Sequence, residues 1–132
     1  MKHFIQYHNT EKMGYSASAM PDPRMFTDKS VRYVPSQAVW LISGEGVKSP
    51  KTFYLAAVFK PNRTTTEMYD HPKFKNAAYG NGYIFGESIT LNGLPWFEKL
   101  KTEQQNFRGG LFEIKDSKVI DELRNFAGVH AL

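Results

Sequence analysis

Residues 51–60 read KTFYLAAVFK, and they form the strongest strand pattern in this chain of 132 residues. β-Branched and aromatic residues that alternate between two faces favour an extended segment, and apolar residues on both faces favour burial on both sides. One face would carry Phe53, Leu55, Ala57 and Phe59, and the other Tyr54, Ala56 and Val58. The pattern therefore predicts a central strand that is covered from both sides.

A second apolar run precedes this strand. Residues 37–43 (QAVWLIS) are nearly continuously apolar, and the turn sequence Gly44-Glu45-Gly46 ends them. Short apolar runs of this kind, bounded by turn residues, are typical of buried strands. Only a short loop with Pro50 separates the two runs, so we expect them to pair as a central hairpin.

Weaker patterns flank the hairpin. Strands are expected at residues 3–7, 83–91 and 107–114, and helices at residues 96–105 and 118–127. The last helix is the clearest, because Asp116 or Ser117 can cap its start and Gly128 can end it. Residues 13–35 and 61–81 are irregular or turn-rich. Strands and helices without regular alternation predict an α+β fold, with a curled antiparallel sheet or small β-barrel and one or two peripheral helices.

Composition places the chain among single-domain proteins. Its length suits one domain spanning residues 1–132, and 41% of the residues are hydrophobic, enough to form a core. The sequence contains no cysteine, which excludes disulfides and thiolate metal sites. No apolar run near the start resembles a signal peptide or a membrane span, so we expect a cytoplasmic protein without a membrane partner.

The charge balance favours polyanionic partners. The formal net charge is +4, and residues 47–66 hold four basic residues and no acidic one. Basic surface raises the encounter rate with phosphate backbones. Lysines that protect a strand edge would explain the same pattern equally well. The candidate phosphate contacts are Lys48, Lys51, Lys60, Arg63 and Arg108.

The residues around the end of the first strand are those that a base pocket uses. Asn or Gln can pair with the edge of a base, and aromatic rings stack on its face. A turn-capping Asn and core tyrosines are the alternative interpretation of the same residues. Trp40, in an apolar strand, fits a core position better than a pocket. The candidate base pocket comprises Tyr7, His8, Asn9, Gly14, Tyr15, Ser16 and Trp40.

Catalytic and metal motifs are incomplete. No two of the four histidines have the spacing that places two ligands on one helical turn. Glu113-Ile114-Lys115 resembles half of a nuclease metal site, but an ordinary strand with one exposed ion pair explains it better. Neither a nucleophile elbow nor a phosphate loop is present. We therefore predict a protein without catalytic activity, metal or cofactor.

Three segments suggest a family. FIQYHNTEKMGY, VWLISGEG and FYLAAVF resemble the small N-terminal domains found ahead of HNH-type nuclease modules in bacterial restriction-like proteins. The resemblance covers about the first sixty residues. Those domains are similar to PUA-like folds, small barrels that include readers of modified or flipped bases. The resemblance implies DNA or RNA recognition around Tyr7, His8, Asn9, Gly14 and Tyr15. The protein would then be either a free-standing reader or the partner of a nuclease or other protein on a separate chain.

Two hypotheses of function follow. The first is a nucleic-acid-binding module that reads a modified or flipped base. The alternative is a protein-interaction or accessory subunit of a defence or phage-related system, which would use an exposed strand edge or the C-terminal helix. A small-molecule enzyme is the weakest hypothesis, because it needs His8 or Glu113 to titrate abnormally in a cleft.

Overall fold

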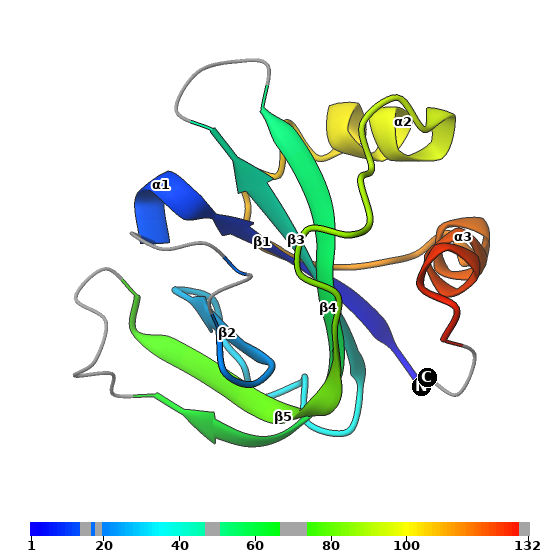
Figure 1. Ribbon diagram of the computed structural model, residues 1–132. Coiled ribbons are helices and arrows are strands. Elements are labelled where there is room, and N and C mark those ends of the chain that lie inside the picture. Colours follow the sequence, from blue (N-terminus) through cyan, green and yellow to red (C-terminus); the bar gives the residue numbers. More distant parts are fainter. Residues whose placement is uncertain (14–16, 18–19, 47–50, 67–73, 130–132) are drawn as a thin grey trace.

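The computed structural model describes residues 1–13, 17, 20–46, 51–66 and 74–129. Within these residues the chain forms a curled, mixed six-stranded sheet that closes into half a barrel, with helices packed against it (Figure 1). The strand order is β2-β5-β4-β3-β1-β6. The elements in chain order are β1 (His3–Asn9), α1 (Thr10–Met13), β2 (Arg24–Thr27), β3 (Ala38–Glu45), β4 (Thr52–Thr65), β5 (Asn76–Ile84), α2 (Pro95–Glu103), β6 (Leu111–Glu113) and α3 (Ser117–Ala127).

The central hairpin predicted from the sequence is confirmed. β3 and β4 pair antiparallel from Val39↔Phe59 to Glu45↔Thr52, with one register shift between Leu41 and Ile42. β3 is buried along almost its whole length and β4 mainly over residues 53–59, as expected for apolar residues on two faces. The hairpin therefore forms the middle of the sheet.

The sheet is mixed, so the prediction of a wholly antiparallel sheet is wrong. β1 pairs in parallel with β3, from His3↔Ala38 to Asn9↔Gly44. Parallel pairing needs a long crossover, and here the chain leaves the end of β1 and returns beside its start, where Ala38 N donates to Lys2 O at 3.0 Å. The crossover has no periodic pattern in the sequence, and for that reason the sequence did not reveal it.

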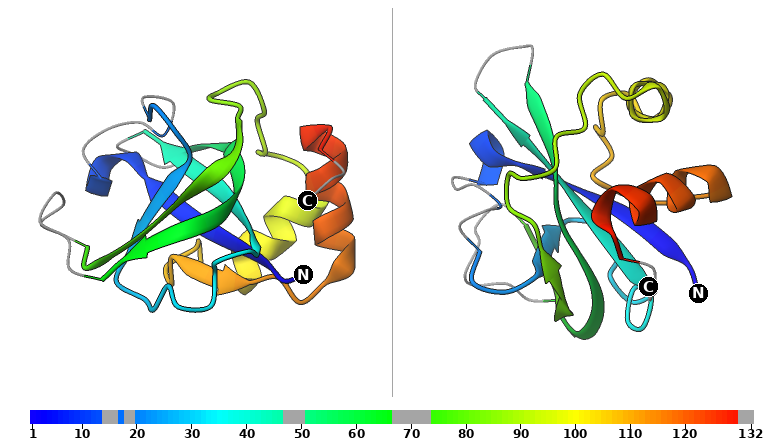
Figure 2. Two further views of the ribbon diagram at one scale, coloured as in Figure 1. Left: turned by 90° about the horizontal axis from the view of Figure 1, so that it is seen from below. Right: turned by 45° about the vertical axis from the view of Figure 1, so that its right-hand side comes forward.

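Each face of the sheet has its own cover. Helices α2 and α3 lie on one side, whereas α1 and the curled-over edge strand β2 lie on the other (Figure 2). The helix side buries Trp40, Phe97 and Leu123 completely. Full burial of one such side chain stabilises the fold by about 1.5–3 kcal/mol. Among the described helices, none combines the length and apolar character needed to cross a bilayer.

Both predicted helices form close to the expected bounds. Pro95 occupies the first turn of α2, a position where its missing N–H costs nothing. The Asp116 side chain caps α3 by accepting from Lys118 N at 2.9 Å. Gly128 ends α3 in the left-handed conformation, with a φ of 66°.

The β4–β5 hairpin corrects two expectations. Residues 61–65 and 76–81 belong to strands and not to a turn-rich connection, because β4 continues to Thr65 and β5 begins at Asn76. The strand expected at residues 83–91 therefore lies earlier in the chain. Gly80 and Gly82 permit close strand pairing, since a β-carbon would lie 2.7 Å from Lys60 C and 2.6 Å from Phe59 Cα, respectively. In the sequence these glycines suggest a turn.

Candidate functional site

Two adjoining pockets open where β1 ends, and together we call them the cleft. The Gln6 pocket, of about 650 Å³, lies between the end of β1, the end of β2 and the loop from α2 to β6. The Lys51 pocket, of about 610 Å³, lies between the start of β4 and α2. Tyr7, Asn9 and Asn106 line both pockets. Each volume suits a small-molecule ligand or a single base.

Tyr7 forms the aromatic wall between the pockets. Its ring centroid lies 5.6 Å from that of Phe107 and 6.0 Å from that of Phe53. Gly44, opposite Asn9 in the sheet, leaves space for the phenol: a β-carbon there would lie 2.8 Å from Tyr7 Cζ. Burial and then the Glu45 carboxylate raise the pKa of Tyr7 to about 12. The phenol is therefore neutral at physiological pH and can donate a hydrogen bond.

The loop between α2 and β6 has an uncommon backbone. Gln105, Asn106 and Phe107 are consecutive residues with φ values of 51°, 57° and 61°. Non-glycine residues rarely adopt this left-handed region, and such residues concentrate at functional sites. The turn buries Phe107, which is 1% exposed, while its two polar neighbours line the cleft.

Interactions with β1 and β2 hold this loop in place. Tyr7 N donates to Gly110 O at 3.0 Å, which ties the loop to β1. Lys29 Nζ donates to Leu111 O at 2.7 Å from the end of β2. Within the turn, Phe107 N donates to Gln104 O at 3.0 Å. These bonds offset the unfavourable dihedral angles and present Gln105, Asn106 and Arg108 from a fixed frame.

Side-chain carboxamides are concentrated in the cleft. Asn92 is already engaged: its Oδ1 accepts from Phe53 N at 2.6 Å and its Nδ2 donates to Lys51 O at 2.9 Å, which fixes the start of β4. Each carboxamide offers both a donor and an acceptor, as recognition of a base edge requires. The carboxamide residues that line the cleft are Gln6, Asn9, Asn92, Gln105 and Asn106.

The charge of the cleft is positive on balance. Its lining includes the cations Lys29, Lys51, Lys101 and Arg108 and the acids Asp28 and Glu98. One cation is neutralised, because Lys101 Nζ lies 3.0 Å from Glu98 Oε2. Within the described part of the chain, neither Lys51 nor Arg108 forms an ion pair. These two cations can therefore attract an anionic ligand.

The structure brings part of the predicted site together. Tyr7 and Asn9, from the predicted base pocket, share the cleft with the predicted phosphate contacts Lys51 and Arg108. Gly14, Tyr15, Ser16 and Lys48 lie outside the described residues.

Two residues of the predicted base pocket lie inside the protein instead. Trp40 is fully buried in the core, where its Nε1 donates to His3 Nδ1 at 3.0 Å. This is the core position that an apolar strand favours, and it removes Trp40 from the site. His8 is 4% exposed and is not among the residues that line the cleft.

The remaining predicted phosphate contacts lie at the opposite end of β4 from Lys51. Lys60 is exposed and pairs in the sheet with Asn81. The Arg63 guanidinium lies 4.6 Å from the centroid of the Tyr79 ring, as a cation–π contact. Lys51 therefore lies in the cleft, whereas Lys60 and Arg63 lie away from it.

Sequence reasoning missed most of the loop between α2 and β6. The segment Gln104-Gln105-Asn106 followed by Gly109-Gly110 carried a usable signal, since amides beside paired glycines are typical of an irregular polar turn. Phe107 led instead to the prediction of a strand that begins at residue 107, because an aromatic residue before an apolar stretch favours a strand. Gln6 belongs to the same amide-rich strand end as Tyr7 and Asn9, but the list of predicted base-pocket residues did not include it.

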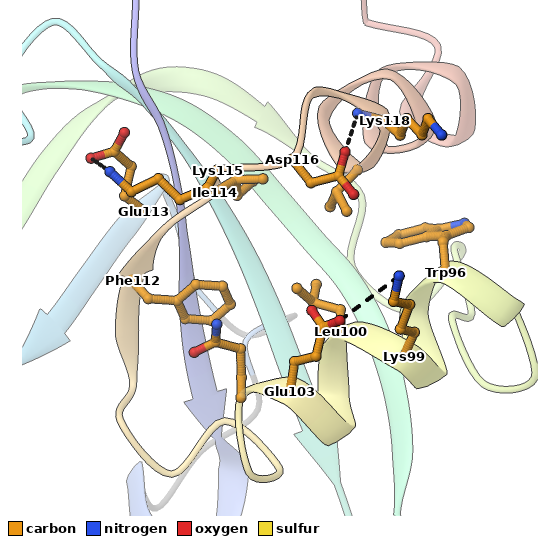
Figure 3. A pocket seen from close by; sticks show the side chains of 12 residues that line it. Trp96, Lys99, Leu100, Glu103, Phe112, Glu113, Ile114, Lys115, Asp116 and Lys118 are labelled. Atoms are coloured by element: carbon orange, nitrogen blue, oxygen red, sulfur yellow. Dashed lines mark hydrogen bonds and ion pairs between the residues drawn. The ribbon is translucent and has the colours of Figure 1, made fainter.

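A further hollow, of about 280 Å³, lies between α2, β6 and the start of α3 (Figure 3). Its charges are neutralised locally: Lys115 Nζ lies 3.1 Å from Glu113 Oε1, and Lys99 Nζ lies 3.9 Å from Glu103 Oε1. The Glu113-Ile114-Lys115 segment thus contains an ion pair between its own ends. Among the described residues, no three His, Asp or Glu side chains cluster as metal ligands would.

Scans against protein-family models, curated proteins and solved structures found no match to this chain.

Proposed function

We propose that this chain is a nucleic-acid-binding module that holds a single base in the cleft at the end of β1. The observation that carries the proposal is the meeting of three groups in one cleft: aromatic rings, side-chain carboxamides and cations without ion-pair partners among the described residues. Each group supplies one part of nucleic-acid recognition, namely stacking, edge hydrogen bonds and phosphate neutralisation.

The aromatic wall supplies the stacking surface. Tyr7 is half-buried, and its packing against Phe53 and Phe107 fixes the ring plane before a ligand arrives. Stacking of a base on an aromatic side chain contributes about 1–3 kcal/mol in proteins that bind single strands. A flipped base must also recover a few kcal/mol of lost pairing and stacking, so a rigid wall is favourable.

The polar rim supplies the edge contacts. Asn9 and Asn106 line both pockets, so their amides lie within the same opening as the Tyr7 ring. Lys51 and Arg108 lie in different pockets on either side of these residues. A strand whose base enters the cleft would therefore have a cation available for the phosphate on each side of it.

The proposal extends to the setting of the protein. The resemblance to small PUA-like domains that precede nuclease modules supports a reader of a flipped or modified base, with a nuclease as the protein partner. In this setting the protein would bind both the nucleic acid and its protein partner in the cytoplasm. Loss of binding in the experiment that follows would remove the support for this setting as well.

The test is fluorescence anisotropy with labelled single-stranded and duplex DNA and RNA at two salt concentrations. We compare the wild-type protein with the double variant Lys51→Ala/Arg108→Ala and with its matched control, Lys60→Ala/Arg63→Ala. Both variants lose one lysine and one arginine, so their net charges are equal. Only the first pair lies in the cleft.

The cleft variant is expected to bind at least tenfold more weakly than the control. Its salt dependence should also be shallower, by about 0.7 in the slope of log K against log salt for each lost phosphate contact to a single strand. Equal weakening in both variants would mean that binding depends on net charge alone. No binding at low salt would exclude the proposed function.

A second candidate function has one specific observation in its favour. β5 pairs with β2 over Asn76–Tyr79, and Gly80 N still donates to Pro23 O, so among the described strands residues 81–84 pair on one side only. Tyr83 and Ile84 in this segment are 51% and 41% exposed. An open edge with exposed apolar side chains suits strand addition by a protein partner. Self-association that is lost in Tyr83→Ser would favour this alternative.

A further inference from the structure

The cleft has room for more than the one base that the proposed function requires. Its two pockets, of about 650 and 610 Å³, are nearly equal in volume, and each lies within the range of pockets that bury a whole small ligand. They share Tyr7, Asn9 and Asn106, while every other described residue of the cleft lines only one of them. A single base therefore leaves one pocket without an occupant.

The Tyr7 ring keeps the two pockets apart. Phe107 packs against this ring and lines the Gln6 pocket, whereas Phe53 packs against it and lines the Lys51 pocket. The phenol also lies against Gly44, where a β-carbon would approach Tyr7 Cζ to 2.8 Å. These contacts hold the ring in place, and a ligand that displaced it would lose their stabilisation. A ligand that fills both pockets must therefore cross over the exposed part of the ring.

The two pockets have matching sets of charges. Each is lined by two cations and one acid: Lys29, Arg108 and Asp28 in the Gln6 pocket, and Lys51, Lys101 and Glu98 in the Lys51 pocket. In each pocket one lysine already has a partner, because Lys29 donates to a backbone carbonyl and Lys101 pairs with Glu98. The second cation, Arg108 or Lys51, forms no ion pair within the described part of the chain. Two pockets with the same charges suit two copies of one anionic unit, such as two nucleotides of a strand.

Amides line the boundary between the pockets. Asn9 and Asn106 contribute to both pockets, and a carboxamide can donate N–H bonds, as a contact to a phosphate requires. The acids Asp28 and Glu98 each line one pocket only, so among the described residues no carboxylate is shared by the two. A phosphate that crosses the boundary would therefore meet amides and no repelling charge.

We infer that the cleft binds two consecutive nucleotides of one strand, with a base in each pocket and the linking phosphate above Tyr7. This inference rests on the proposed function and names its ligand as an unstacked dinucleotide step. Because Tyr7 stands between the pockets, the two bases cannot stack on each other. Two neighbouring bases of a duplex would both have to leave the helix, at about twice the cost of one flipped base, so the preferred ligand is a single strand.

The test compares labelled DNA strands of one length in which most nucleotides lack a base. The first strand carries one thymine, the second two adjacent thymines, and the third two thymines at opposite ends. All have the same number of phosphates, so their charge is equal. We expect the adjacent pair to bind the wild-type protein at least about fivefold more tightly than the distant pair, the lower end of the contribution of one stacked base. The distant pair should exceed the single thymine only by the statistical factor for two equivalent bases.

Photocrosslinking assigns each base to its pocket. In the strand with two adjacent thymines, one or the other is replaced by 4-thiothymine, which on irradiation forms a covalent bond with a residue that it contacts. Mass spectrometry of the digested product should place one position at residues 51–53 or 98–101, from the Lys51 pocket. The other position should crosslink to residues 105–110, from the Gln6 pocket.

The outcomes separate this inference from the proposed function, with oligo(dT) of the same length as the reference strand. Equal affinity for the adjacent and the distant pair, while oligo(dT) binds, would overturn the two-base ligand and leave the binding function standing. Crosslinks from both positions to the same pocket would overturn the assignment of one base to each pocket. Failure of oligo(dT) and of every other strand to bind at low salt would exclude the proposed function itself.

Discussion

The position of the Tyr7 ring in the cleft depends on the absence of a side chain at Gly44. It pairs with Asn9 in the sheet, and the phenol of Tyr7 lies over it with no room for a β-carbon. A larger residue would push the Tyr7 ring away from its contacts with Phe53 and Phe107. The shape of the aromatic wall therefore depends on a residue that does not itself line the cleft.

We expect Gly44→Ala to lower the free energy of unfolding by about 1–3 kcal/mol, the usual cost of overpacking. It should also weaken nucleic-acid binding, because the Tyr7 ring moves. Urea denaturation and fluorescence anisotropy measure the two effects. The double variant Gly44→Ala/Tyr7→Leu should recover most of the stability but not the binding. If the double variant lost as much stability as the two single variants together, the proposed clash between residue 44 and the Tyr7 ring would be contradicted.

His3 is a buried group whose protonation opposes folding. It stacks on Trp40 and accepts from Trp40 Nε1 through Nδ1, which must therefore be unprotonated. Burial, then the Arg124 guanidinium and the N-terminal amine, lower the pKa of His3 below its ordinary value of 6.5. Below pH 6.5 the unfolded chain consequently binds a proton that the folded protein resists.

The contribution of His3 to stability is therefore complete above pH 6.5 and is lost as the pH falls from there toward the lower folded pKa. The variant His3→Gln keeps an acceptor for Trp40 and does not titrate. Urea unfolding above and below pH 6.5 should show a smaller loss of stability in the variant than in the wild-type protein. Identical pH dependence in both would show that His3 is not the responsible group.

At the scale of an element, the loop between α2 and β6 combines unfavourable backbone dihedral angles with side chains that line the proposed binding cleft. Gln105 has a φ of 51°, a region that costs an ordinary residue about 1–2 kcal/mol and glycine almost nothing. Its side chain lines the Gln6 pocket. The position therefore carries an unfavourable backbone conformation together with a polar group placed for binding.

We expect Gln105→Gly to leave the free energy of unfolding unchanged or to raise it by up to about 1 kcal/mol, while nucleic-acid binding weakens. Gln104→Gly is the matched control. Gln104 has a φ of −96° and lines the hollow beside α3 rather than the cleft, so the control should lose stability and keep binding. Thermal unfolding measures the stability of each variant, and fluorescence anisotropy measures its nucleic-acid binding. Destabilisation of the same size in both variants would contradict this account.

The central hairpin and the C-terminal helix show how far local pattern reaches. A nearly continuous apolar run and an alternating one predicted the β3–β4 hairpin, and a cap at Asp116 or Ser117 together with Gly128 predicted α3. The parallel β1–β3 pairing was not predictable in this way, because it depends on a crossover without periodicity. Likewise, three non-glycine residues at positive φ have no signature in a single sequence.

Over the whole molecule, the sequence pattern placed Tyr7 and Asn9 together, but it did not show which of the predicted cations lie beside them. Tyr7 and Asn9 end a strand, so their position beside a pocket followed from the pattern. The partners that complete the cleft are distant in sequence: Lys51 directly precedes β4, and Arg108 lies in the loop before β6. Lys60 and Arg63 seemed equivalent to them by charge, and only the fold separates the two pairs.

The most direct test of the cleft as a nucleic-acid site is a titration followed by two-dimensional ¹H–¹⁵N NMR. Short single-stranded DNA is added to the labelled protein, and each backbone amide reports whether it lies near the ligand. The account predicts the largest shift changes at Tyr7, Asn9, Lys51 and the Gln105–Gly110 loop, with small changes at Lys60 and Arg63. Changes centred on β5 near Tyr83, or spread evenly over the basic residues, would contradict it.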